Sequence, residues 1–167
     1  ERELINQYIF GLVQDWVTPL TLFLKRGFKN YSRKVYGANA AKSLIHRRAL
    51  HRDGYNSTID PSLVLVSSGK VLLPEGLQAS LGAEGEVLFS WDPVTSGASP
   101  RDRIMLLAYN VEKKWPEFEL SGPKRLEGTA RLPLMGNVPG TYHLYAAFVS
   151  EDGAEQSDSR YLGVVER

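Results

Sequence analysis

The residue types that most often perform chemistry are sparse in this chain of 167 residues with three histidines. His46 and His51 are five residues apart, which on a helix turns their side chains about 140° from each other and prevents a shared metal-binding face. His143 is expected on the solvent side of a strand. The chain has no cysteine, which excludes disulfides, thiol catalysis and cysteine-bound zinc or iron–sulfur clusters. We predict no metal and no cofactor.

Motifs for nucleophilic catalysis and phosphate binding are also missing. The sequence has no G-x-S-x-G, G-x-x-x-x-G-K-[ST], G-x-G-x-x-G or H-E-x-x-H pattern. Three pairs of neighbouring carboxylates have the residue types that glycoside hydrolysis needs, but they flank turns or lie where charge keeps a sheet soluble. The pairs are Glu84 with Glu86, Glu117 with Glu119, and Glu151 with Asp152. We expect solvated carboxylates and predict that the protein is not an enzyme.

Two groups of basic residues are the best candidates for binding. One group lies between the apolar positions of an expected second helix, and the other follows an expected third helix. On one molecule they would form a positive surface for phosphate, an acidic partner or an anionic glycan. The alternative, which we favour, is a solvated helix face with some positive charges near helix C-termini. The residues are Lys25, Arg26, Lys29, Arg33 and Lys34, then Arg47, Arg48 and Arg52.

Trp115 is the candidate residue for contact with a sugar. It precedes Pro116 and Phe118 at the start of an expected strand. An exposed tryptophan can stack on a sugar ring, whereas a buried one would pack in a core or between domains. We favour packing for Trp115, and we assign Trp16 to a helix stripe and Trp91 to a sheet core.

Composition places the chain among ordinary globular proteins, with 43% hydrophobic and 23% charged residues and a net charge of +1. The charge is uneven, because residues 1–60 hold ten Lys/Arg and five Asp/Glu whereas residues 61–167 hold ten and fourteen. No stretch reaches the ~20 apolar residues of a membrane helix, so we predict no membrane span. The net charge of the whole chain does not indicate nucleic acid as a partner.

The first 55 residues have the apolar spacing of helices. A second helix is expected to start at Thr18, an N-cap followed by proline at the first helical position, and to run to about Tyr36. A third is expected from Ala38 to Leu50. The first helix carries the stripe Leu4, Ile5, Tyr8, Ile9, Leu12, Val13 and Trp16.

Beyond residue 60 the pattern changes to short strands separated by glycine and proline. Helices confined to one end of the sequence and strands to the other predict an α+β fold with an antiparallel β-sandwich. We divide the chain into a helical segment (1–55), a connector with one strand (56–76) and the sandwich (77–167). The expected strands are 62–67, 77–82, 86–91, 103–111, 115–120, 127–133, 141–150 and 157–165.

Two aromatic residues have informative places in the expected sandwich. Trp91 is the last residue of a strand in which Val87 and Phe89 alternate with other residues, and Tyr142 lies near the start of a later strand, where a tyrosine corner would lie. With these features the sandwich resembles a fibronectin type III domain. The resemblance covers about Leu77 to Glu166 and implies an immunoglobulin-like topology.

Five short segments along the whole chain carry a second resemblance. They are LKRGFK (24–29), NAA (39–41), DPSLVLVSSG (60–69), YN (109–110) and SRYLG (159–163). With these segments in this order, the chain resembles a family of small uncharacterised Bacteroidetes proteins. The resemblance implies no catalytic or binding residues. It also implies that the chain lacks a glycine-rich N-terminal segment, so that we expect a fragment.

Together these observations predict a non-enzymatic interaction or structural module. The apolar stripes of the first two helices cannot both be buried by each other, so we expect the helices to pack on the sandwich or on a second copy. A protein partner or self-association is the expected mode of action. The alternatives are a carbohydrate or cell-envelope binding module, by analogy with other fibronectin-like domains, and nucleic-acid binding through the basic helices.

Overall fold

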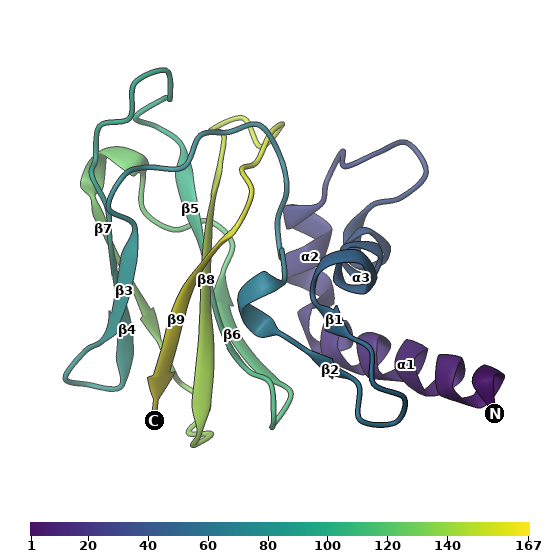
Figure 1. Cartoon of the computed structure of the whole chain (residues 1–167). Helices are drawn as coiled ribbons and strands as arrows, with labels where there is room; N and C mark the ends of the chain where they lie inside the picture. Colours follow the sequence, from purple (N-terminus) through teal and green to yellow (C-terminus); the bar gives the residue numbers. More distant parts are fainter.

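The computed structural model describes residues 1–167 and contains two antiparallel sheets that face each other (Figure 1). The smaller sheet has the order β3-β4-β7, with bounds Gln78–Leu81, Glu86–Ser90 and Thr129–Pro133. The larger sheet has the order β6-β5-β8-β9, with bounds Trp115–Glu119, Arg103–Asn110, Thr141–Val149 and Arg160–Glu166. The chain is thus an α+β fold, as predicted, and seven of the eight expected strands form.

Alternate side chains of the strands fill the space between the sheets. Successive side chains of a strand point to opposite faces, so every second residue of β5 and β8 points into this core. Leu106 and Ala108 of β5 meet Leu144 and Ala146 of β8 there. Trp91 is buried here, as predicted, and its indole Nε1 donates to the Arg125 carbonyl at 2.8 Å.

The tyrosine at the start of β8 makes the expected corner contact. The Tyr142 hydroxyl donates to the Val138 carbonyl, four residues upstream, at 2.7 Å. This hydrogen bond closes the loop that leads into β8, and it satisfies a hydroxyl whose ring lies in the core.

The helices cover the outer face of the larger sheet. The helices are α1 (Arg2–Val17), α2 (Thr21–Gly27) and α3 (Gly37–Arg48), and Figure 1 shows them on the side of the larger sheet away from β3-β4-β7. The Trp16 ring meets Tyr109 edge-on with centroids 5.1 Å apart, and the Tyr109 hydroxyl donates to the Trp16 carbonyl at 2.8 Å. The predicted contact between helices and sandwich is confirmed.

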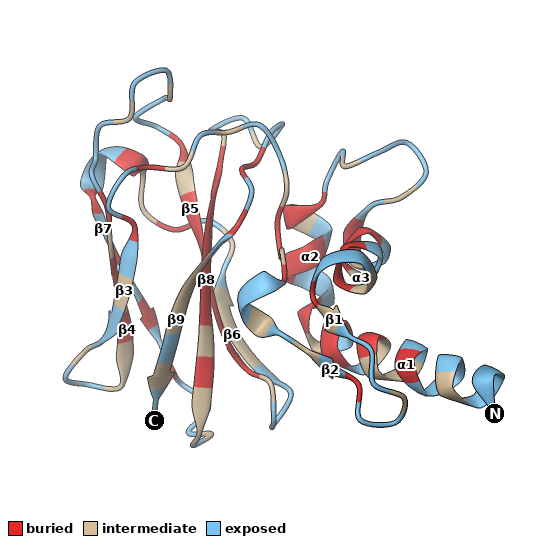
Figure 2. Ribbon diagram, viewed as in Figure 1, coloured by how far each residue is buried: buried red, intermediate tan, exposed pale blue.

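Because of this layer, β5 and β8 are buried on both faces (Figure 2). Met105, Leu107 and Tyr109 of β5 and Tyr145 of β8 belong to a second core, which they share with the helices. Most antiparallel sheets leave one face in water. Here the larger sheet is the middle layer of the molecule.

The second helix is shorter than predicted. It ends at Gly27, and residues 28–36 form turns rather than helix to Tyr36. A Cβ on Gly27 would lie 2.2 Å from the Val66 carbonyl oxygen, and the Ser68 amide donates to the Gly27 carbonyl at 3.0 Å. The end of α2 is therefore determined by a close backbone crossing with residues 66–68.

The predicted N-cap at Thr18 is also wrong, since α1 continues directly into a 3₁₀ turn, Thr18–Leu20. The Thr18 hydroxyl donates backward to the Gln14 carbonyl at 2.7 Å instead of accepting from the next turn. Pro19 does lie at the start of this turn, where its missing N–H costs nothing.

The strand predicted at 62–67 does not form. Pro61–Leu63 is a 3₁₀ turn, and the following chain satisfies its backbone through side chains and isolated contacts. The Val66 amide donates to the Ser159 hydroxyl at 2.9 Å, and the Ser159 amide donates to the Ser67 carbonyl at 3.0 Å. A short antiparallel pair of strands precedes this segment. Its strands, of two residues each, are β1 (Leu50–His51) and β2 (Thr58–Ile59).

Candidate functional site

The eight predicted basic residues do not form one surface. Lys25 of α2 lies beside the first residue of α3, since a Cβ on Gly37 would lie 3.9 Å from the Lys25 Cα. Arg47 and Arg48 are in the last turn of the same helix, about 15 Å away at 1.5 Å per residue. The positive residues therefore divide into two clusters at opposite ends of α3.

The first cluster is partly used to join α2 to the sandwich. The Arg26 guanidinium donates to the Gly153 carbonyl at 3.0 Å and to the Gln156 Oε1 at 3.2 Å, and the Lys29 ammonium donates to the Gly153 carbonyl at 3.2 Å. Gln156 is buried, and its amide donates to the Lys29 carbonyl at 2.6 Å. Partial burial lowers the pKa of Arg26, an effect that the nearby Asp152 carboxylate opposes.

Between α2 and the loop that follows it lies a concave surface of about 560 Å³, which we call the cationic groove. Its walls carry amino and guanidinium groups, while its apolar part comes from side chains of α2, the loop and the end of β6. A volume of this size is in the range of small-ligand and peptide-anchor sites. It is lined by Leu22, Lys25, Arg26, Lys29, Asn30, Ser32, Tyr36 and Leu120.

Three positive side chains in or beside the groove have no partner. Lys25 lines the groove, whereas Arg33 and Lys34 lie beside it, on the loop between the lining residues Ser32 and Tyr36. All three are exposed and make no ion pair or hydrogen bond within the chain. A carboxylate of the adjacent loop, Asp152, interacts by charge with Arg26 and Lys29. The Asp152 carboxylate accepts from the Ala154 amide at 3.0 Å and from the Ser150 hydroxyl at 2.7 Å, which lowers its pKa.

The second cluster, Arg47, Arg48 and Arg52, is exposed and has no ion pair. Arg47 and Arg48 are in the last turn of α3, where positive charge interacts favourably with the helix dipole. Partial burial and the charge of Arg52 lower the pKa of His46 in the same turn. This cluster lines none of the concave surfaces described here and fits the solvated-face interpretation.

Trp115 is not packed in a core, contrary to the preferred interpretation. Its side chain belongs to neither core and is 40% exposed on β6, at the edge of the larger sheet. One face of the ring covers the backbone of Gly136, where a Cβ would lie 2.5 Å from the indole. Met135, next to Gly136, is 80% exposed. Trp115 and Met135 therefore form a small exposed apolar area.

His143 does not point freely to solvent as predicted. It lies on the opposite face of β8 from Tyr142 and Leu144, as expected, but it is half-buried, with its Nδ1 2.8 Å from the Tyr161 hydroxyl. Desolvation lowers its pKa, against the opposing influence of Asp60 and Glu166. Tyr161 of β9 explains the difference, because its ring lies beside the imidazole with centroids 5.9 Å apart and shields it from water.

The candidate carboxylate pairs serve local structure. Glu86 is paired with Arg131 at 2.9 Å, and Glu117 accepts from the Gly136 amide at 2.9 Å. Glu119 accepts from the Ser121 amide at 2.9 Å, and Glu151 lies 3.7 Å from Arg101. These contacts fit the expectation of solvated or turn-bound carboxylates.

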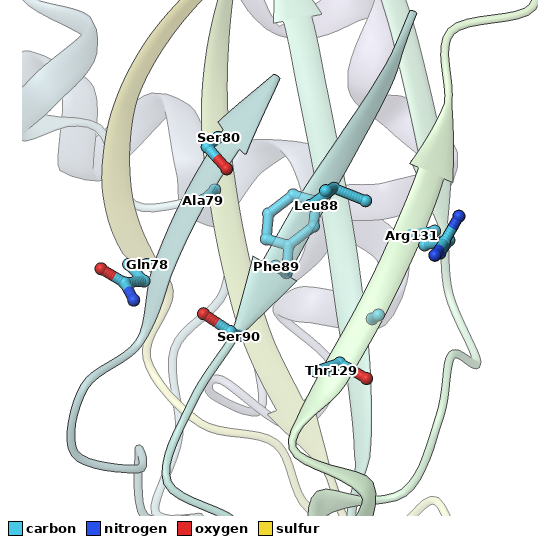
Figure 3. A pocket seen from close by; sticks show the side chains of 9 residues that line it. Gln78, Ala79, Ser80, Leu88, Phe89, Ser90, Thr129 and Arg131 are labelled. Atoms are coloured by element: carbon cyan, nitrogen blue, oxygen red, sulfur yellow. The ribbon is translucent and has the colours of Figure 1, made fainter. Parts of the chain in front are cut away.

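The outer face of the smaller sheet is a second concave surface, of about 450 Å³ (Figure 3). Figure 3 shows that short polar side chains line it, with Leu88 among them; Gln78, Ser80, Ser90 and Thr129 carry its amide and hydroxyl groups. Its one charged lining group, Arg131, is engaged by Glu86. This is the usual polar face of an antiparallel sheet.

No three His, Asp or Glu side chains are grouped so that they could hold a metal ion. No helix has the length and apolar character that a membrane crossing requires.

Comparison with known proteins gives one match, to the model of a family of unknown function, DUF6266, over residues 3–163. The chain belongs to this family. No curated protein and no solved structure matches the chain. The DUF6266 match extends over the helices, the connector and both sheets, so one family model includes the helical layer together with the sandwich.

Within the DUF6266 region, sequence reasoning missed the apolar part of the groove and the residue that anchors its wall. Leu22 was assigned no role and Tyr36 was placed in a helix stripe, yet they are 66% and 64% exposed at the groove. Gln156 is polar and follows a turn, and nothing in its neighbourhood in the sequence indicates that it is buried against α2. The sequence signal that could have indicated the groove is the mixture of apolar and basic residues over 22–36.

Proposed function

We propose that this DUF6266 protein is a non-enzymatic protein-interaction or structural module that associates with further copies of itself through the N-terminal part of α1. The observation that carries the proposal is an apolar helix end without a partner. Leu4 and Phe10 are 59% and 61% exposed, and Tyr8 is 41% exposed beside Tyr55, which is 52% exposed. Large apolar groups gathered at one end of a molecule are typical of a protein contact.

Gly11 supports a helix–helix contact at this place. It lies in the interior of α1, where glycine costs roughly 1 kcal/mol relative to alanine, yet a Cβ there would meet no atom within 4 Å. Packing within the chain therefore gives no reason for a glycine, whereas close approach of a second backbone would.

The sandwich part of the proposal is that β3 to β9 form a fibronectin type III-like domain. The support is the arrangement of three strands facing four, the buried Trp91 and the Tyr142 corner hydrogen bond. The order of the short segments matched in the sequence supports a Bacteroidetes source.

The test is the molar mass in solution by light scattering, at low and high salt, for the wild type and for the Leu4→Ser/Phe10→Ser variant. We expect a wild-type oligomer that persists in high salt, because apolar contacts are not screened, and a monomeric variant. Val94→Ser, at a 78% exposed side chain of the sandwich, is the control and should stay oligomeric. A wild-type monomer at all concentrations would contradict self-association.

Carbohydrate binding is the second candidate, and the exposure of Trp115 favours it. The indole is 40% exposed and held in one orientation by the Gly136 backbone, as a stacking platform requires. Quenching of Trp115 fluorescence by bacterial polysaccharides, and its loss in Trp115→Ala, would support this function. Unchanged fluorescence across a glycan panel would remove it.

A further inference from the structure

The cationic groove combines two features that one ligand must match. Leu22, Tyr36 and Leu120 give it an apolar part, and the exposed state of Leu22 and Tyr36 leaves that part open to a ligand. Around it, Lys25 and Arg26 of α2 and Lys29 of the following turn supply positive charge.

The walls of the groove are held before any ligand arrives. Arg26 and Lys29 are tied to the Gly153 carbonyl, and the Asn30 amide donates to the Ala154 carbonyl at 3.2 Å. These contacts fix the C-terminal end of α2 and the start of the loop on the sandwich. Pre-ordered walls reduce the entropy that binding would otherwise cost.

Part of the positive charge has no counter-charge within the chain. The Asp152 carboxylate interacts by charge with Arg26 and Lys29, and Glu151 pairs with Arg101. Lys25, Arg33 and Lys34 make no ion pair or hydrogen bond. The groove and its rim therefore favour a ligand with several negative charges spread along its length.

We propose that the cationic groove binds an acidic segment of a partner protein that carries a large apolar side chain. The carboxylates match the unpaired lysines and arginine of the rim, and the apolar side chain matches Leu22, Tyr36 and Leu120. This site is separate from the proposed self-association surface, because Leu4 lies about 20 Å along α1 from its junction with the turn that leads to α2.

A nucleic acid fits the same surface less well. Single-stranded nucleic acids use several aromatic platforms along a continuous positive track, but Tyr36 is the one aromatic residue of the groove. The second cluster of arginines lies at the far end of α3, so the track is interrupted.

The experiment measures binding of a fluorescent peptide of glutamates around one leucine, by anisotropy at low salt. The groove variant is Lys25→Glu/Lys34→Glu, at two exposed residues whose side chains make no ion pair or hydrogen bond. The matched control is Arg47→Glu/Arg48→Glu, which changes the net charge equally at the other end of α3. We expect the groove variant to bind about tenfold more weakly or worse, and the control to bind within about twofold of the wild type.

Two more arms test the apolar part and the choice of ligand. Leu22→Ser, and a peptide with serine in place of leucine, should each weaken binding, because both remove the apolar contact. Absence of wild-type binding, equal loss in both charge variants, equal binding of the serine peptide, or tighter binding of a single-stranded oligonucleotide would each overturn the proposal. Circular dichroism of each variant verifies that it is folded.

Discussion

Arg125 is a fully buried charged residue with a complete set of partners. Its guanidinium donates to Asp102 Oδ2 at 3.0 and 3.3 Å and to the Leu72 carbonyl at 2.6 Å, and it lies 4.4 Å from the centre of the Phe148 ring. The Arg125 carbonyl also accepts from Trp91. A single side chain thus connects the connector, β8 and the turn before β7.

The Asp102–Arg125 pair predicts a large effect of removing one partner. Asp102→Ala should lower the free energy of unfolding by about 3–5 kcal/mol, because it leaves a buried charge without a counter-ion. Urea denaturation measures the change. The exposed pair Arg101–Glu151 is the control, and Glu151→Ala should cost less than about 1 kcal/mol. Equal losses would show that burial of Asp102 does not matter.

Buried tyrosines predict sensitivity to alkaline pH. Burial raises the pKa of Tyr109, and it raises the pKa of Tyr145 well above its ordinary value, so the folded state keeps protons that the unfolded chain releases. The resulting stability is present in full below about pH 10, the unfolded pKa, and is lost as pH rises toward the folded pKa. Unfolding free energies at about pH 8 and 11 should fall less in Tyr109→Phe/Tyr145→Phe than in the wild type. A parallel fall in both would contradict this role.

At the scale of elements, two glycines in the helices have opposite surroundings. Gly27 permits the crossing with Val66 that ends α2, whereas Gly11 has open space around it. Helical propensity treats both residues alike. Their surroundings in the folded chain are what distinguish them.

The two glycines give a paired prediction. Gly27→Ala should destabilise the protein by roughly 1–3 kcal/mol or more, since the added methyl group collides with a backbone oxygen that cannot move aside. Gly11→Ala should stabilise the monomeric fold by about 0.5–1 kcal/mol. Thermal melts of both variants measure the difference. Destabilisation by Gly11→Ala would contradict the open surroundings of that residue.

Strands β5 and β8 are covered on both faces by other parts of the molecule. Their sequences are almost continuously apolar, because one face meets the smaller sheet and the other meets the helices. The edge strands β3 and β7 alternate or are exposed, as expected with water on one side.

At the scale of the whole molecule, the helices and the sandwich share a core. Trp16 is 6% exposed against Tyr109. Trp16→Asp should therefore cost more than about 3 kcal/mol and unfold helices and sandwich in one transition. Far-ultraviolet and tryptophan signals recorded through urea denaturation test this. A folded, unchanged variant would show that the α1 contact contributes little.

The shared core also predicts the behaviour of the sandwich alone. A fragment of residues 77–167 would expose Met105, Leu107, Tyr109 and Tyr145, which the helices cover in the full chain. We expect this fragment to aggregate or to unfold at lower urea than the full chain. A soluble fragment with full stability would show that the sandwich is an independent unit.

The amino-acid sequence determined the parts of the structure that depend on local pattern. The stripe of α1, the small residues of α3 and the strand periods of β3 to β9 follow from spacing that neighbouring residues set. The roles of Trp91 and Tyr142 were predictable because each depends on its place within a strand.

The tertiary structure decided what depends on residues distant in the chain. The end of α2 at Gly27 is set by contact with residues 66–68. The orientation of Arg26 is set by its hydrogen bond to the Gly153 carbonyl, 127 residues away. The separation of the basic residues into two clusters and the exposure of Trp115 arise in the same way. Such crossings are set by how the layers pack, and local spacing carries no record of them.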